Sequence, residues 1–144
     1  MPGIGPVPVV KVDKKDGSIV YTYNSINEAA IYTEMLPGSM QARAQNFNGC
    51  RGRYMYCVES KYNGIIDFTD KSYRPVLAFP KNNPYIAYWY CDLFDFCNKT
   101  ASNYDTVRHI MCNKKESRKY ILRYVSTTED IIYLENIGIP VIES

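Results

Sequence analysis

The same sequence pattern starts at two places, Pro8-Val9-Val10-Lys11-Val12 and Pro75-Val76-Leu77-Ala78-Phe79, where residue 8 and residue 75 are 67 positions apart. At this shift three further identities fall two residues apart, on one face of an extended strand: Ile19 with Ile86, Tyr21 with Tyr88 and Tyr23 with Tyr90. A chance alignment would scatter its identities over both faces. The sequence therefore predicts a tandem duplication.

The first copy reads as five elements. Residues 9–12 and 18–23 are predicted strands joined by a turn that contains Asp16-Gly17. Ser25-Ile26-Asn27-Glu28 predicts a capping box in which Ser25 and Glu28 bond each other's backbone N–H, and Pro37-Gly38 is expected to end the helix that follows. Ser39 is the expected cap of a second helix at 40–47, which Asn48-Gly49 stops, and residues 53–59 form a third strand.

The second copy follows the same order, with a hairpin turn at 82–84, helices at 93–99 and 104–112 capped by Asp92 and Asn103, and a closing strand at 120–126. Closing the alignment by two residues between the helices pairs Arg43 with Arg108 and Asn48 with Asn113, and reopening it pairs Val58 with Val125. The predicted fold class is α+β, with two tandem ββααβ modules. Each is a small antiparallel sheet packed with a pair of helices resembling a helix-turn-helix.

The predicted division of the chain is a first module at 1–59, a connector at 60–74, a second module at 75–126 and a tail at 127–144. A brief strand at 64–68 is a further possibility. The apolar stretches of the tail predict packing either on the body or on a second subunit, which would make a homodimer.

Composition narrows the class of protein. A hydrophobic share of 46% with 22% charged residues is typical of a folded domain, and the sequence has no apolar run of about 18 residues that would span a membrane. No targeting signal is recognisable at the N-terminus, so we expect a cytoplasmic location. Five cysteines without metal-ligand spacing and one histidine, His109, predict neither a zinc site nor a disulfide framework, and no cofactor is expected.

The second helix of the first copy carries side chains that can recognise DNA bases. Met40, Ala44 and Phe47 have helical spacing and should face inward, which leaves the polar positions to solvent. Arg pairs well with guanine, and Asn or Gln with adenine. The predicted DNA contacts, including basic residues that would hold phosphates, are Gln41, Arg43, Gln45, Asn46, Asn48, Arg51 and Arg53 in the first copy, and Arg108, Lys114, Lys115 and Arg118 in the second.

Three short stretches carry a resemblance to a known family: Ser25-Ile26-Asn27-Glu28-Ala29-Ala30, Asn48-Gly49-Cys50-Arg51 and Gly52-Arg53-Tyr54-Met55-Tyr56. They resemble the NUMOD-type modular DNA-binding repeats that accompany homing endonucleases of phages and mobile elements. The resemblance implies duplex DNA binding by the second helix. The second copy departs from the pattern: it lacks the Ala-Ala pair and the turn glycine, and Asp105 in its second helix would repel phosphates.

Catalysis is not expected, because the sequence has no recognisable nuclease motif and His109 has no paired nucleophile at suitable spacing. The aromatic strand at 85–90 offers a different function. Tyr85 and Trp89 would lie on the face opposite Ile86, Tyr88 and Tyr90, where they could stack a base. The alternative to DNA binding is thus a small phage or mobile-element binding or inhibitor protein that holds a protein partner or a nucleotide.

Overall fold

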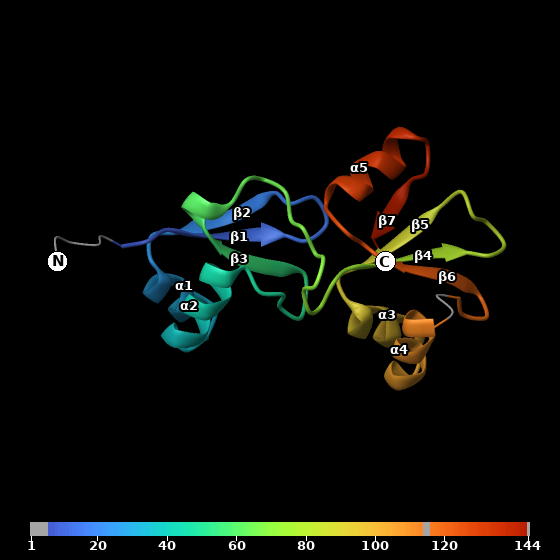
Figure 1. The fold of residues 1–144 in the computed structure, drawn as a ribbon, viewed down its shortest axis with the longest axis horizontal. Helices are drawn as coiled ribbons and strands as arrows, with labels where there is room; N and C mark the ends of the chain where they lie inside the picture. The colour runs from blue at the N-terminus through green and yellow to red at the C-terminus, as the bar shows by residue number, and fades with distance from the viewer. Residues whose placement is uncertain (1–5, 114–115, 144) are drawn as a thin grey trace.

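The computed structural model describes residues 6–113 and 116–143 (Figure 1). It is a mixed α+β fold, and its described residues form five α-helices and two sheets. The first half contains β1 (Val9–Asp13), β2 (Ile19–Tyr23), α1 (Ile26–Tyr32), α2 (Pro37–Asn46) and β3 (Tyr54–Val58), followed by a 3-10 turn, η1 (Glu59–Lys61). The second half contains β4 (Val76–Pro80), β5 (Ala87–Tyr90), α3 (Leu93–Thr100), α4 (Tyr104–Asn113), β6 (Tyr120–Tyr124), α5 (Glu129–Asn136) and β7 (Val141–Glu143).

Strand pairing is alike in the two sheets, whose orders are β2-β1-β3 and β6-β4-β5-β7. The N–H of Glu59 donates to the carbonyl of Pro8, and the N–H of Val125 donates to the carbonyl of Pro75, both at 2.9 Å. Val9 accordingly lies opposite Val58, and Val76 lies opposite Tyr124. The predicted pairing of Val58 with Val125 is therefore wrong by one residue, because the loop before β6 is one residue shorter than its counterpart.

The second helices also correct the predicted alignment. Each starts with a 3.0 Å backbone hydrogen bond, from Met40 to Leu36 in α2 and from Val107 to Asn103 in α4, at the ungapped shift of 67. Their buried residues agree, since Met40 and Ala44 in α2 match Val107 and Met111 in α4. The predicted gap between the helices is wrong, and the counterpart of Arg108 is Gln41, not Arg43.

The structure agrees with only part of the predicted helix capping. The Ser25 hydroxyl accepts a hydrogen bond from the Glu28 N–H at 3.0 Å, and Asp92 and Asn103 cap α3 and α4 in the same way. The Glu28 carboxylate, however, accepts from the N–H of Asn24 instead of Ser25. These three predicted N-caps are confirmed, whereas the reciprocal half of the capping box is not.

The predicted start and end of α2 are wrong. Pro37 does not end the first helix but opens the second, at a position where its missing N–H and fixed φ cost nothing. Leu36, held extended before the proline, is the N-cap, so Ser39 lies inside the helix. The helix ends at Phe47, which has the left-handed conformation (φ 49°) predicted for Asn48-Gly49.

Three apolar clusters hold the fold together. One packs α1 and α2 on one face of the first sheet, around Val9, Met40 and Ala44. The corresponding cluster packs α3 and α4 on the second sheet, around Val76, Phe96 and Val107. The third joins the two halves, because it contains residues of both sheets, the connector, α5 and β7: Val10, Val12, Met55, Cys57, Ile66, Phe68, Leu77, Ala87, Trp89, Val125, Ile131 and Val141.

The connector and the tail contribute to this shared core. Ile66 and Phe68 are buried, although the predicted strand at 64–68 is reduced to a single bridge between Asp67 and Thr127. The tail folds onto its own chain, where β7 pairs parallel with β5 and α5 lies over the second sheet (Figure 1). No helix in the described ranges has both the length and the apolar character needed to cross a membrane.

Candidate nucleic-acid interface

The outer face of α2 is polar and open to solvent. Met40 and Ala44 bury the inner face of the helix, and Gln41, Gln45 and Asn46 are exposed on the other side. The helix has no acidic residue. Each exposed amide can donate and accept in one plane, which is the requirement for recognising adenine in the major groove. This part of the predicted site is therefore accessible, and the face neither packs on the sheet nor lies under the tail.

Arg43 and Asn48 lie at the edge of this face. The Nη1 of Arg43 is 3.0 Å from the Cys50 sulfur. Arg43 and Asn48 line a cavity of about 770 Å³ beside the connector. Gly49 explains how the connector comes so close: a Cβ at this position would lie 1.7 Å from the carbonyl oxygen of Ser72. A side chain there would push the connector away from the end of α2.

The second helix of the second half has a different surface. Arg108 and His109 are exposed on α4, together with Asp105 in its first turn. The Asn113 amide contacts the His109 ring at 3.2 Å. Arg118 is exposed before β6, and the predicted contacts Lys114 and Lys115 lie outside the described residues. The structure thus leaves Arg108 and Arg118 accessible, but Asp105 lies three residues before Arg108 on the same helix.

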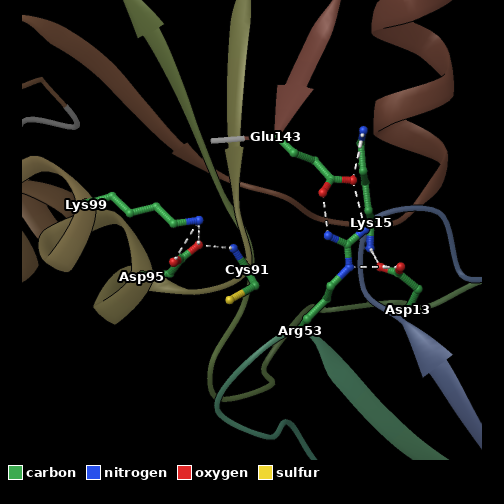
Figure 2. Close-up of polar contacts among 7 residues, drawn as sticks. All are labelled: Asp13, Lys15, Arg53, Cys91, Asp95, Lys99 and Glu143. Carbon is green, nitrogen blue, oxygen red and sulfur yellow. Dashed lines mark hydrogen bonds and ion pairs between the residues drawn. The ribbon is translucent and has the colours of Figure 1, made fainter.

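Arg53 is only partly exposed, because it joins an ion-pair network that links β7 to the first sheet (Figure 2). Its Nε donates to Asp13 at 3.0 Å, and its other nitrogens bond both oxygens of Glu143, at the end of β7. Lys15 also pairs with Glu143, at 3.3 Å. The hydrogen bonds from Arg53 lower the pKa of Glu143 to about 2. Arg53 thus ties the tail to the first sheet, and its guanidinium already pairs with two carboxylates.

Arg51, by contrast, is exposed and stacks on an aromatic ring of the other half. Its guanidinium carbon lies 4.2 Å from the centre of the Phe94 ring. The Nη and Nε groups along the guanidinium edge stay available to an anion while its face is stacked. Arg51 therefore remains a candidate phosphate contact, at the junction of the halves.

Lys14, which the sequence suggested only as a turn residue, is a buried structural cation. Its side chain is 0% exposed, and its Nζ donates to the carbonyls of Cys50, Tyr73 and Cys91 at 2.5, 2.7 and 3.3 Å. Burial lowers the pKa of Lys14, against the attraction of Asp92. The ammonium thus joins three chain segments that lie far apart in the sequence.

The predicted stacking pair does not exist as a surface. Trp89 is 3% exposed and belongs to the shared core, where α5 and β7 cover the face that was expected to be open. Tyr85 is 76% exposed, in the loop before β5. The prediction for Trp89 is wrong because a single sequence does not show that the tail returns to this strand.

The cysteines serve mainly as apolar side chains. Cys50, Cys57 and Cys97 are buried, Cys91 is half-buried and Cys112 is exposed, and all five are free. Burial raises the pKa of Cys91 to about 12, so its thiol stays protonated at neutral pH. The described residues contain no cluster of three or more His, Cys, Asp or Glu side chains that could hold a metal.

Sequence reasoning missed the connector as part of the candidate surface. Lys71 and Arg74 lie between the two helix pairs, with Tyr73 exposed between them. A signal was present in the sequence, since Lys71-Ser72-Tyr73-Arg74 combines two cations with an aromatic residue inside a segment otherwise treated as a linker.

No protein-family model, curated protein or solved structure matches this chain.

Proposed function

We propose that this protein binds duplex DNA without catalysing a reaction, and that α2 is its recognition helix. The observation that carries the proposal is the open face of α2, where Gln41, Gln45 and Asn46 are exposed on a helix without acidic residues. Such side chains can enter a major groove and bond base edges, while nearby cations fix the register on phosphates. Cytoplasmic DNA, for example of a phage or mobile element, would be the natural partner.

The arrangement of the halves supports the proposal. Both helix pairs lie on the same side of the two sheets (Figure 1), so α2 and α4 could face one DNA molecule. Arg43, Arg51 and Lys71 lie around the junction between them. The repeated strand registers also favour two tandem ββααβ modules that arose by duplication, consistent with the resemblance to NUMOD-type repeats.

A salt-dependent titration tests the proposal. Fluorescence anisotropy with random duplex DNA should give an affinity that falls steeply as salt rises from about 50 mM, since phosphate contacts release counterions. The triple change Gln41→Ala, Gln45→Ala and Asn46→Ala should weaken binding of a selected duplex about tenfold or more, because one bidentate base contact contributes about 1–3 kcal/mol. Asn136→Ala, on the distant α5, is the matched control. Absence of binding to any duplex at about 50 mM salt would contradict the proposal.

The contribution of the second module to duplex binding can be tested by removing the negative charge of Asp105. Asp105→Asn should strengthen duplex binding by about two- to fivefold at low salt and by less at high salt, since a single charge near phosphates is screened. The same titration series measures this change. If Asp105→Asn leaves the affinity unchanged at all salt concentrations, α4 does not approach the DNA.

An alternative function is the capture of a protein partner, by a small binding or inhibitor protein. It is favoured by an exposed apolar group at the α1–α2 turn, where Ile31 is 73% and Leu36 75% exposed, with Tyr32 beside them. Ile132, Tyr133 and Ile137 are similarly exposed on the tail, which keeps a homodimer through the tail among the proposals. Binding of a protein through apolar surface would tolerate salt, so the same titration distinguishes the two functions.

A further inference from the structure

The hollow between the connector and the α3–α4 pair has the chemistry of a nucleotide site. It measures about 440 Å³, and its lining includes Lys71, Tyr73, Arg74, Tyr104 and Tyr124. Cations and aromatic rings are the two elements by which proteins hold single-stranded nucleic acid, with the cations on phosphates and the rings on bases. Recognition of duplex DNA by α2 does not require this hollow, so the proposed function gives the hollow no role.

Two aromatic rings that line the hollow form a layered stack with Arg51. Phe94 and Tyr104 are parallel within 5°, with their ring centres 4.2 Å apart. Arg51 lies over the Phe94 ring at the same distance. Two planar groups cannot occupy one ring face at that spacing, so Arg51 and Tyr104 cover opposite faces of Phe94. Because Tyr104 also lines the hollow, a base bound there would lie against this stack.

Tyr73 adds a ring at the rim of the hollow and a strained backbone beneath it. It is 41% exposed and has a φ of 57°, a conformation that is uncommon for a bulky residue. The Nζ of Lys14 bonds the Tyr73 carbonyl at 2.7 Å and so holds this backbone in place. Strain of this kind tends to gather where a side chain must be presented to a ligand.

Arg74 supplies an unused donor. Its Nη2 donates to the Val125 carbonyl at 3.3 Å, and its guanidinium carbon lies 4.9 Å from the centre of the Tyr124 ring. Its Nε is buried and has no hydrogen-bond partner among the described residues. A buried donor without a partner is costly, and a ligand oxygen could satisfy it.

The lining also includes an anion, Asp92, whose charge must be accounted for. It is almost fully buried, and its two oxygens accept from the N–H groups of Asp95 and Gly52, both at 2.8 Å. Its negative charge also attracts the ammonium of Lys14 and acts to raise the pKa of that lysine. Asp92 is thus committed to the protein. The Nζ of Lys71 donates one hydrogen bond to the Phe47 carbonyl at 2.5 Å, and its positive charge, with that of Arg74, still acts on a ligand in the hollow.

We propose that this hollow binds one nucleoside 5′-phosphate unit, either free or at an unpaired position of a DNA strand. The base contacts the rings of both Tyr73 and Tyr104, and the phosphate lies between Lys71 and Arg74. The site shares Lys71 with the junction cations but does not include Gln41, Gln45 or Asn46, and it goes beyond the proposed function.

Calorimetric titration of the whole chain tests the site with two sources of the ligand, dTMP or dAMP and a 5′-phosphorylated (dT)4. Saturable binding of either is expected, and the tighter arm identifies the source. Tyr73→Gly should weaken it about tenfold through loss of one stacking ring, and it should still fold, because glycine favours the positive φ and keeps the carbonyl that Lys14 bonds. Arg74→Gln should weaken it to a similar extent.

Tyr85→Ala is the matched control, because it removes an exposed tyrosine outside this hollow. Failure of both ligands to bind the wild type overturns the proposal, as does unchanged binding by Tyr73→Gly. An equal loss in Tyr85→Ala or in the α2 triple variant also overturns it, since the ligand would then be held elsewhere. Duplex binding is measured separately with the α2 variants, so either proposal can fail alone.

Discussion

Strands β2 and β5 occupy the same place in the two halves but differ in what covers them. In the first half β2 is an edge strand, and Ile19, Val20 and Tyr21 are about half exposed. In the second half β7 pairs with β5 along its outer edge, and the tail closes over the sheet. One additional segment has therefore turned an exposed strand into part of the shared core.

The turns after β1 and β4 also differ in how deeply they are buried. Lys14 is buried at the junction and bonds three carbonyls, whereas its counterpart Lys81 is exposed and pairs with Glu116. The order of the first five elements occurs again in the second half, but the corresponding lysines make different contacts. The comparison indicates that residues equivalent by alignment can be buried structural groups in one half and exposed surface groups in the other.

Changing Trp89 to Ala should have the largest effect on stability. Trp89 is buried in the shared core, so the substitution should lower the free energy of unfolding by about 3–5 kcal/mol. Its counterpart on β2, Thr22, is exposed, and Thr22→Ala should change stability by less than about 0.5 kcal/mol. Urea unfolding followed by circular dichroism measures both. Similar costs for the two variants would mean that the tail does not cover β5 in solution.

Replacing Lys14 comes next. Lys14→Met leaves three carbonyls without their donor, and the expected loss is about 2–4 kcal/mol. Lys81→Met removes only an exposed ion pair and should cost less than about 1 kcal/mol. The same unfolding measurement separates the two. A Lys14→Met variant as stable as Lys81→Met would show that the junction does not depend on the buried ammonium.

Local signals predicted much of this fold. The caps Ser25, Asp92 and Asn103 and the alternating strands depend on neighbours in the sequence, and each was placed within a few residues. Pro37 was misread because a proline can either follow a helix or open the next one, and the choice depends on the packing of Met40.

Long-range contacts could not be predicted from the sequence. The strand of the tail, β7, has three residues and pairs with a strand more than 50 positions away, so no sequence periodicity predicts it. Its pairing buries Trp89 and recruits Arg53, which changes two predicted site residues at once. The exposed positions of α2 were predictable, because they require only the helical period and the buried Met40 and Ala44.

The smallest stability effect concerns the ion pair that fastens the tail. The ordinary pKa of Glu143, 4.5, is lowered to about 2 by the hydrogen bonds from Arg53. Its stabilising contribution is therefore complete above about pH 4.5 and is lost as the pH falls toward 2. The carboxylate is more than a third exposed, so after solvent screening the contribution should not exceed about 1 kcal/mol.

Glu143→Gln should lower stability at pH 7 and flatten the dependence of stability on pH between 4.5 and 2, when compared with the wild type by urea unfolding across that range. Glu135→Gln, which removes an exposed carboxylate from α5, should leave the wild-type dependence in place. A first half that lost its link to β7 would keep its own helix pair packed around Met40. Duplex binding by α2 should then survive in Glu143→Gln, and a parallel loss of DNA affinity would mean that the tail also positions the recognition helix.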